Sequence, residues 1–321
     1  MQQNTLKVGI IGVGYLGTFH ARIFSAMPTV AAVGIYDPDE QRCAELAQKY
    51  NVSVFSSQEE LIASSDVLSI VAPTRFHHEI AIKCLEKNKD IFIEKPIAST
   101  VDEAEAIEAY ANKKGCIVQV GHVERFNAVV EAVKPLIKSP RFIQVDRLGP
   151  HSFRSTDICV VRDLMIHDID ILLHLVNSPI QKVDAIGVSV ISDIEDLVNA
   201  RIIFENGCVA NVNASRASIK QVRKIRIFQE NVCVSIDYKK QRVHIYSKKE
   251  RAKGSFFSRS FSDYIQRRSL KIQKNQPLDE ELLAFVRCVY TREEPLVSAH
   301  DGTEALRVAQ EIQWQIKQSL S

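Results

Sequence analysis

The sequence predicts an α/β protein in which a doubly wound parallel sheet is followed by an α+β domain with an antiparallel sheet. Over residues 7–120, short runs rich in Val and Ile alternate with amphipathic stretches, which is the order of parallel strands joined by helices. After residue 183, strand-like segments follow one another, and Asn206-Gly207 between two of them is a strong hairpin signal. The change of pattern indicates two sheets of different topology.

Length and composition bound the class of protein. The chain has 321 residues, enough for two domains of about 100–200 residues, which we place at 1–121 and 122–321. The formal net charge of +2 argues against a general nucleic-acid binder, which carries a strong basic stripe. The sequence contains no run of about 18 apolar residues, so we expect no membrane span. The polar N-terminus lacks the apolar stretch of a signal peptide. The seven scattered cysteines form no C-x-x-C pair, so we expect reduced thiols in a cytoplasmic protein.

The expected N-terminal strands are apolar on both faces, as buried parallel strands are. They are 7–11, 31–36, 67–71, 91–93 and 117–120, with a weaker one at 54–55. Helices lie between them, and capping-box signatures mark two helix starts: Ser57 with Glu60, and Thr100 with Glu103. Farther along we expect helices at 127–138, 163–175, 279–291 and 301–318, and strands at 141–148, 183–190, 198–204, 208–213, 222–228, 232–236 and 242–246. The basic stretch 239–274 is interpreted as a solvated loop or sheet edge, with phosphate contact as the alternative.

A glycine motif follows the first strand and opens a helix. Gly12 permits the tight turn, Gly14 lets the backbone approach a pyrophosphate, and Gly17 allows close packing of helix and strand. The helix start offers free N–H groups and a partial positive charge to the phosphates. In this context the motif predicts a Rossmann dinucleotide site, in preference to a purely structural glycine turn.

Asp37 ends the second strand, where a carboxylate binds the adenosine ribose hydroxyls. A carboxylate there repels a 2′-phosphate, so NAD is favoured over NADP, and Arg42 in the next helix only partly offsets it. Methyltransferases that bind S-adenosylmethionine also combine a glycine loop with a following acid, but the next motif argues against them.

Glu94-Lys95-Pro96 follows the fifth strand, at the edge where such sheets bind ligands. Lys95 there can reach a nicotinamide or a substrate hydroxyl, although a surface lysine at a strand end is the ordinary alternative. Asp163 and His167, four residues apart, share one helix face. An imidazole suits removal of a proton from an alcohol while hydride leaves its carbon, and Lys95 would stabilise the alkoxide in a cleft between the domains. The alternative is a surface Asp–His pair.

The same helix carries more potential ligands, and Asp170 and His174 continue the stripe of Asp163 and His167 while Asp168 points elsewhere. Hydride transfer to NAD requires no metal, so we expect no metal site.

These motifs, together with the turn Pro73-Thr74-Arg75-Phe76-His77, resemble the Gfo/Idh/MocA oxidoreductases over essentially the whole chain. The resemblance implies a Rossmann domain, a second domain built on a large, mostly antiparallel sheet, and oxidation of a sugar or cyclitol hydroxyl with NAD or NADP. It implies that Lys95, Asp163 and His167 are catalytic. The expected NAD-binding residues are Gly12, Gly14, Tyr15, Leu16, Gly17, Asp37, Pro73, Thr74, His77, Glu94 and Lys95.

The linker 121–127 and the segment Arg147-Leu148-Gly149-Pro150 with Arg154 resemble the branch that oxidises UDP-N-acetylglucosamine at its 3-hydroxyl, toward 2,3-diamino sugars of lipid A. We therefore expect Arg125, Arg147 and Arg154 to be available to a diphosphate, or else to pair with acids. His151-Ser152-Phe153 departs from the Pro-rich segment of that branch, which bears on the substrate and not on the reaction class. The expected substrate-binding residues are His122, Glu124, Arg125, Asn127 and Arg154.

Two alternatives stay open on the sequence alone. One is the same chemistry on a free sugar or inositol, and the other is an NAD-binding regulator on a dehydrogenase scaffold. The family usually packs its C-terminal sheet against another subunit, so the resemblance implies a homodimer or homotetramer with a small-molecule substrate, and neither nucleic acid nor membrane as partner.

Overall fold

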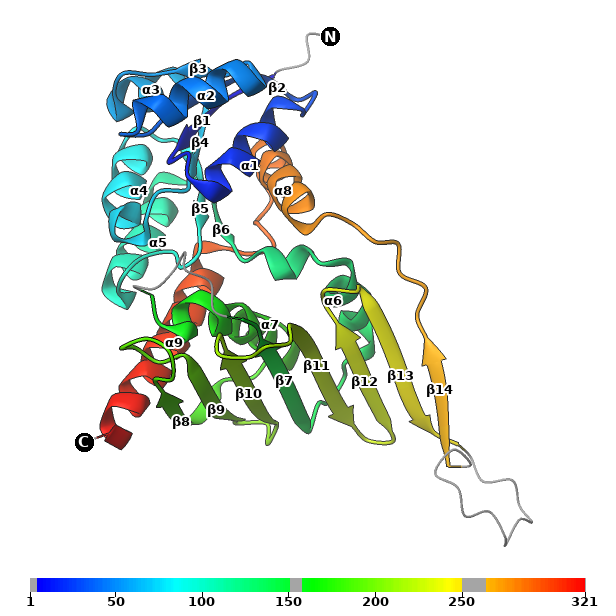
Figure 1. Ribbon diagram of the computed structural model, residues 1–321. Helices are drawn as coiled ribbons and strands as arrows, with labels where there is room; N and C mark the ends of the chain where they lie inside the picture. The colour runs from blue at the N-terminus through cyan, green and yellow to red at the C-terminus, as the bar shows by residue number, and fades with distance from the viewer. Residues whose placement is uncertain (1–4, 151–157, 250–263, 321) are drawn as a thin grey trace, which may run out of the picture. The chain divides into compact units, whose positions relative to one another are not determined.

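The computed structural model describes residues 5–150, 158–249 and 264–320. The chain divides into two compact units. Figure 1 shows the ribbon, coloured by residue number from blue at the N-terminus to red at the C-terminus. The first comprises Met1–Val123 and Gln276–Arg307, and the second comprises Glu124–Asn275 and Val308–Ser321. The division therefore differs from the predicted 1–121 and 122–321 in one large respect, because a C-terminal segment belongs with the N-terminal unit.

The first unit is built on a six-stranded sheet with the strand order β3-β2-β1-β4-β5-β6. Every neighbouring pair in it is parallel, which confirms the predicted doubly wound sheet. The strands are β1 (Leu6–Ile11), β2 (Val30–Tyr36), β3 (Ser53–Val54), β4 (Val67–Ile70), β5 (Asp90–Glu94) and β6 (Val118–Gly121). The order reverses between β1 and β4, and such switch points are where open α/β sheets bind ligands.

Helices join these strands and are capped by side chains. They are α1 (Tyr15–Ser25), α2 (Glu40–Tyr50), α3 (Gln58–Ser64), η1 (Thr74–Phe76), α4 (His77–Glu86) and α5 (Val101–Lys114). Thr100 and Glu103 form the complete capping box that their spacing predicts. Ser57 accepts a hydrogen bond from the N–H of Glu60. The Glu60 carboxylate accepts instead from the Ser56 hydroxyl, so only half of the second predicted box is made.

Helix α8 (Pro277–Thr291) explains why the C-terminal segment joins the first unit. Its Phe285 is fully buried and meets Phe92 of β5 edge-on, with the ring centroids 5.9 Å apart. The Gln119 side chain donates to the carbonyl of Glu281 over 2.9 Å, and Arg292 pairs with Asp90. Helical periodicity marks such a helix but does not reveal which sheet its apolar face will cover.

The second unit is built on an eight-stranded sheet with the order β14-β13-β12-β11-β7-β10-β9-β8. All neighbours are antiparallel except β7 and β10, which confirms the large, mostly antiparallel sheet. The strands are β7 (Phe142–Leu148), β8 (Ile180–Val188), β9 (Leu197–Phe204), β10 (Val209–Ser215), β11 (Val222–Gln229), β12 (Val232–Asp237), β13 (Arg242–Lys248) and β14 (Ile265–Ser269).

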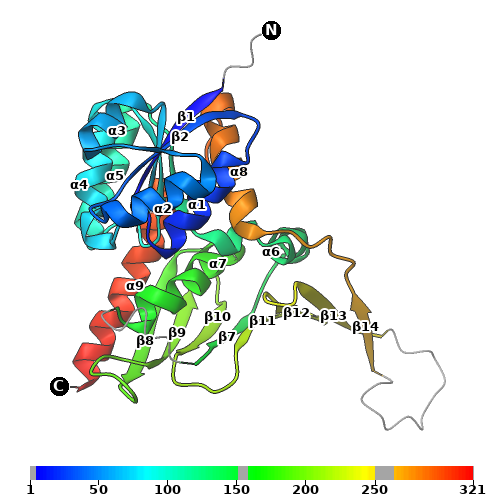
Figure 2. The ribbon, with the colours of Figure 1, turned by 45° about the horizontal axis from the view of Figure 1, so that its top comes forward.

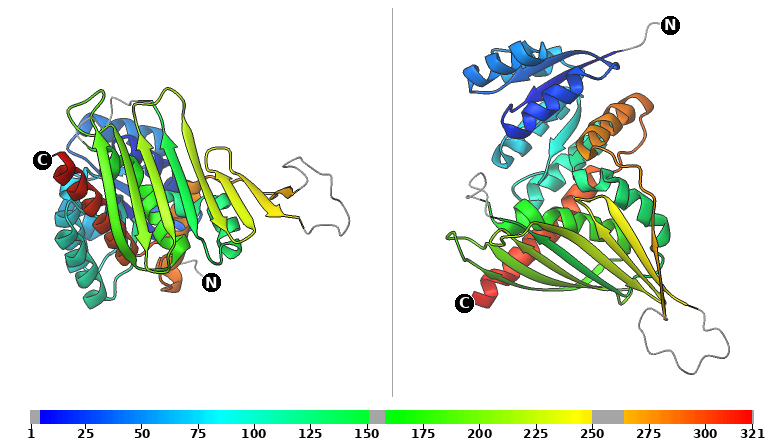
Figure 3. Two further views of the ribbon diagram at one scale, coloured as in Figure 1. Left: turned by 90° about the horizontal axis from the view of Figure 1, so that it is seen from below. Right: turned by 45° about the vertical axis from the view of Figure 1, so that its right-hand side comes forward.

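One face of this sheet is covered by helices, and the left view of Figure 3 looks onto the other. The strand residues alternate accordingly, as in β7, where Ile143, Val145 and Arg147 are buried and their neighbours are only half-buried. The remaining helical segments are η2 (Val123–Phe126), α6 (Ala128–Val133), η3 (Lys134–Leu136), η4 (Val161–Met165), α7 (Ile166–Val176) and α9 (Ala299–Leu320). Among the described residues, no helix is both long and apolar enough to cross a membrane.

Candidate functional site

A cavity of about 830 Å³ lies in the first unit at the carboxyl ends of β1, β2 and β4. This is the switch point of the strand order, where a ligand is expected. Six of the predicted cofactor residues line the cavity: Gly12, Gly14, Tyr15, Leu16, Asp37 and Pro73. The structure therefore brings the glycine turn, the end of β2 and the turn after β4 to one place.

The three glycines differ in what a side chain would meet. Gly12 has φ +96°, and a Cβ there would lie 2.6 Å from the backbone nitrogen of Ala72. A Cβ on Gly17 would lie 2.1 Å from the carbonyl oxygen of Gly12, whereas one on Gly14 would meet nothing within 4 Å. Gly14 is also the N-cap of α1 and gives it no side-chain cap. Open space beside an uncapped helix start fits a pyrophosphate, because the N–H groups there attract anions.

Asp37 is held in place by the turn it faces. One carboxylate oxygen accepts the N–H of Val13 over 2.8 Å, and the other accepts the N–H of Asp39 over 2.9 Å. Each oxygen keeps a further lone pair, and the residue lines the cavity. The guanidinium of Arg42 donates a hydrogen bond to the hydroxyl of Thr18 in α1 and forms an ion pair with Glu45 in α2.

His77 is buried and is not among the residues that line the cavity. It is 1% exposed, and its ring nitrogens face two backbone carbonyls, Nδ1 that of Pro96 at 2.9 Å and Nε2 that of Ala72 at 2.7 Å. Burial lowers the pKa of His77 against the opposing effect of these carbonyls. The side chain thus links the turn after β4 to the turn after β5.

Glu94 holds the start of the Lys95 turn. Its Oε2 accepts the N–H of Lys95 over 3.2 Å, and its Oε1 lies 3.3 Å from Nε2 of His20, whose Nδ1 faces the Ser69 hydroxyl. Burial alone would raise the pKa of Glu94, but His20 and Lys95 outweigh it and the net shift is downward. The sequence analysis did not identify His20 and Ser69. The signal that could have found them is a polar residue within a mostly apolar, buried element, His20 in α1 and Ser69 in β4.

In the second unit, Asp163 and His167 come from a continuous helical segment. Asp163 lies in η4, a π-helical turn, and His167 lies in the first turn of α7. Such turns are rare and often accompany functional sites. Both residues are half-buried, whereas Asp168 and Asp170 on the same segment are fully buried. Figure 2 shows α7 against the sheet.

Two arginines neutralise the buried acids of α7. Arg147 of β7 donates to both oxygens of Asp168, and Arg125 of η2 donates to both oxygens of Asp170. Arg125 also lies 2.9 Å from Nδ1 of His174. Asp170 and His174 are therefore bound to a guanidinium, and the described residues hold no group of three or more His, Cys, Asp or Glu arranged for a metal.

This network includes three of the residues predicted to bind substrate, Glu124, Arg125 and Asn127. Arg125 is 5% exposed and satisfied by Asp170, so its guanidinium is committed inside the unit. Glu124 accepts hydrogen bonds from Arg147 and from Asn127, each over 3.1 Å, and all three residues are buried. The alternative, pairing with acids, holds for Arg125 and Arg147. His122 is buried in the first unit, and Arg154 lies outside the described residues.

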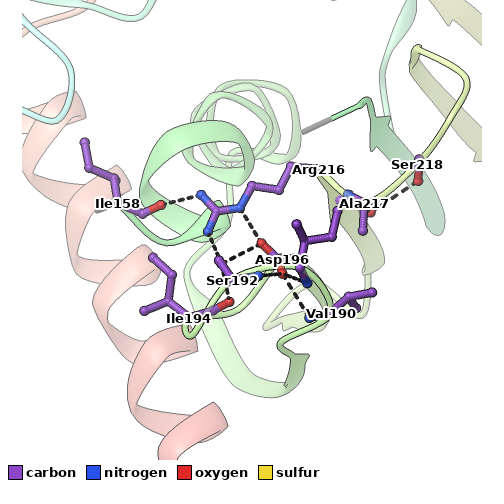
Figure 4. A network of polar contacts seen from close by, with 10 residues as sticks. Ile158, Val190, Ser192, Ile194, Asp196, Arg216, Ala217 and Ser218 are labelled. Atoms are coloured by element: carbon purple, nitrogen blue, oxygen red, sulfur yellow. Dashed lines mark hydrogen bonds and ion pairs between the residues drawn. The ribbon is translucent and has the colours of Figure 1, made fainter. Parts of the chain in front are cut away.

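Another buried ion pair, Asp196 with Arg216, holds the residues that precede η4 (Figure 4). Asp196 is fully buried and accepts three backbone N–H groups, those of Val190, Ile191 and Ser192, over 2.6–2.9 Å. Arg216 donates to Asp196 over 2.7 Å and to the carbonyl of Ile158 over 2.8 Å. Burial alone would raise the pKa of Asp196, but these N–H groups and Arg216 hold it far below its usual range. The pair thereby anchors the chain five residues before Asp163.

Comparison with known proteins agrees with this geometry. Residues 6–122 match the model of an oxidoreductase family with an NAD-binding Rossmann fold, and residues 144–234 match the C-terminal domain of the GFO/IDH/MocA family. A UDP-N-acetylglucosamine 3-dehydrogenase of Acidithiobacillus ferrooxidans is 35% identical over 75% of this chain and 77% of its own. A crystal structure of the 3-dehydrogenase from that organism aligns with a TM-score of 0.90 over 99% of both chains, at 29% identity. A scyllo-inositol 2-dehydrogenase (NAD(+)) of Bacillus subtilis is 26% identical over 95% of this chain and 92% of its own.

The Asp196–Arg216 pair generates a pH-dependent prediction. Asp196→Asn should lower the free energy of unfolding at neutral pH by about 3–5 kcal/mol, because the buried Arg216 loses the carboxylate that it meets at 2.7 Å. The pKa of Asp196 is depressed on folding, so the wild-type advantage is fully present above the ordinary aspartate pKa, about 3.9, and declines as the pH falls below it. Denaturant unfolding measured from neutral to acidic pH tests both statements. The control is Asp193→Asn, an exposed residue of the same loop, and equal stability of the two variants would contradict the assignment.

Proposed function

The chain belongs to the Gfo/Idh/MocA oxidoreductases and is an NAD-dependent dehydrogenase acting on CH–OH groups, and we propose that it oxidises the 3-hydroxyl of a UDP-N-acetylhexosamine such as UDP-N-acetylglucosamine. The observation that carries this proposal is the likeness to the 3-dehydrogenase of Acidithiobacillus ferrooxidans, which extends over 99% of both folds. The second candidate is a free cyclitol, favoured by the likeness to the scyllo-inositol enzyme over 95% of the chain.

The cavity of the first unit supplies what a dinucleotide needs. We propose that the N–H groups at the start of α1, beside Gly14, bind the pyrophosphate, and that Asp37 accepts hydrogen bonds from the adenosine ribose. Bound NAD supplies the acceptor for the hydride. Pro73 and Thr74 lie on the turn after β4 that we assign to the nicotinamide end, and His77 supports that turn from below through Ala72.

We assign three side chains to the removal of the hydroxyl proton and to the stabilisation of the negative charge that develops on the oxygen. We propose that the imidazole of His167 removes the hydroxyl proton and that Asp163 sets its orientation. The ammonium group of Lys95 would stabilise negative charge on the same oxygen as the C–H bond breaks. Glu94 contributes by holding the backbone of Lys95, so its role in the reaction is positional.

A substrate screen tests the proposal directly. Purified protein with NAD should form NADH with UDP-N-acetylglucosamine at a kcat/KM at least about tenfold above that for N-acetylglucosamine or scyllo-inositol, because the nucleotide adds charged contacts of about 1.5–3 kcal/mol each. Higher kcat/KM with scyllo-inositol would favour the second candidate. NAD binding without turnover of any of these compounds would favour a regulator on a dehydrogenase scaffold.

The catalytic assignment predicts non-additive losses. Lys95→Ala and His167→Ala should each lower kcat by about 10²–10⁴ and leave the Kd for NAD within about twofold. If both groups act on one oxygen in one step, the double variant should lose much less than the product of the single losses. Stopped-flow kinetics and NAD titration measure these quantities. His300→Ala is the control, since that side chain is 69% exposed, and full activity of His167→Ala would refute its role as base.

A further inference from the structure

Two arginines lie side by side on the helix-covered face of the large sheet. Arg223 of β11 is paired in register with Arg147 of β7, and Ile225 of β11 is buried on the same face as Val145. Like charges directly opposite one another destabilise an antiparallel pair. Each guanidinium therefore needs an anionic partner. Among the described residues, the two guanidinium groups differ in how closely carboxylates approach them.

Arg147 makes the hydrogen bonds to the two nearest carboxylates. It takes both oxygens of Asp168 and the Oε1 of Glu124, while the Oε2 of Glu124 accepts from Asn127. Arg223 comes no nearer than 3.9 Å to that same Oε1 of Glu124. Within the part of the chain that the structure describes, the guanidinium of Arg223 makes no hydrogen bond. Five N–H donors are thus unmatched on a side chain that is only 40% exposed.

The surroundings of Arg223 favour an added anion. Burial and then the charge of Arg147 lower the pKa of Arg223, while Glu124, Asp168 and Asp163 act in the opposite direction. Arg223 lies opposite Arg147, and Arg147 binds Asp168 of α7, the helix that carries His167. A guanidinium held there, partly desolvated and short of partners, is matched by a phosphate oxygen pair, which it binds in a bidentate manner.

We propose that Arg223 binds the diphosphate of a nucleotide-sugar substrate and so distinguishes it from an uncharged sugar. This inference rests on the proposed function and names the residue that carries its substrate preference. Arg125, expected from the sequence to do this, is committed to Asp170 instead. Arg223 is thus a specificity-determining residue and takes no part in the chemical step.

The test measures binding of UDP, which carries the diphosphate and undergoes no reaction. Arg223→Gln should weaken the Kd for UDP about 10–100-fold, and Arg223→Lys should lose less, because an ammonium keeps the charge but lacks the bidentate fork. The matched control is Arg226→Gln, three residues along β11, which is 47% exposed and lies 3.7 Å from Asp146. It should stay within about twofold of wild type. Binding of NAD should be unchanged in all three.

The outcomes separate this inference from the proposed function. Wild-type binding of UDP with no loss in Arg223→Gln, or an equal loss in Arg226→Gln, overturns the role of Arg223 and leaves the proposed function standing. Failure of the wild type to bind UDP overturns both. Residual oxidation of N-acetylglucosamine gives the final readout: kcat/KM for this uncharged sugar should be unchanged in Arg223→Gln, and a parallel loss indicates a structural role instead. If Arg223→Gln does not fold, Arg223→Lys carries the same comparison.

Discussion

The second unit is organised around two carboxylates buried on α7. Asp168 and Asp170 are fully desolvated, and each is satisfied by one guanidinium, that of Arg147 or that of Arg125. Buried ion pairs add little net stability, because desolvation offsets their attraction, but the loss of one partner is costly. Their consequence here is geometric. A helix that must point two acids at two arginines can adopt one rotation about its axis, and that rotation leaves Asp163 and His167 half-buried.

The same logic holds before the helix and in the first unit. Asp196 and Arg216 fix the carbonyl of Ile158, so the chain enters η4 from an anchored point. In the first unit, His77 and Glu94 lie beneath the turns that carry Pro73 and Lys95, and each makes contacts to backbone atoms of those turns. In both units, buried polar groups hold the backbone next to the residues that are expected to meet ligand.

The sequence was most informative where a local conformation admits few residue types. The turn at Gly12 needs φ near +96° and has no room for a Cβ, so the glycine motif predicted both the sheet and the dinucleotide cavity. Strand alternation likewise predicted the antiparallel sheet. It was least informative where the answer depends on tertiary partners. Nothing in the periodicity of α8 shows that Phe285 meets Phe92, and nothing in the linker shows that Arg125 faces Asp170. Arg223 was missed for the same reason: within the described residues its guanidinium reaches only Glu124, at 3.9 Å, while Arg147 hydrogen-bonds to Glu124 and Asp168.

In the proposed reaction, hydride leaves carbon 3 of a UDP-N-acetylhexosamine, and isotope transfer measures this step. The protein is incubated with NAD and UDP-N-acetylglucosamine deuterated at carbon 3, and the reduced cofactor is analysed by mass spectrometry. We expect that the NADH formed carries one deuterium, and that substrate deuterated at carbon 4 yields unlabelled NADH. Unlabelled NADH from the carbon-3 substrate, or no NADH at all, would contradict it.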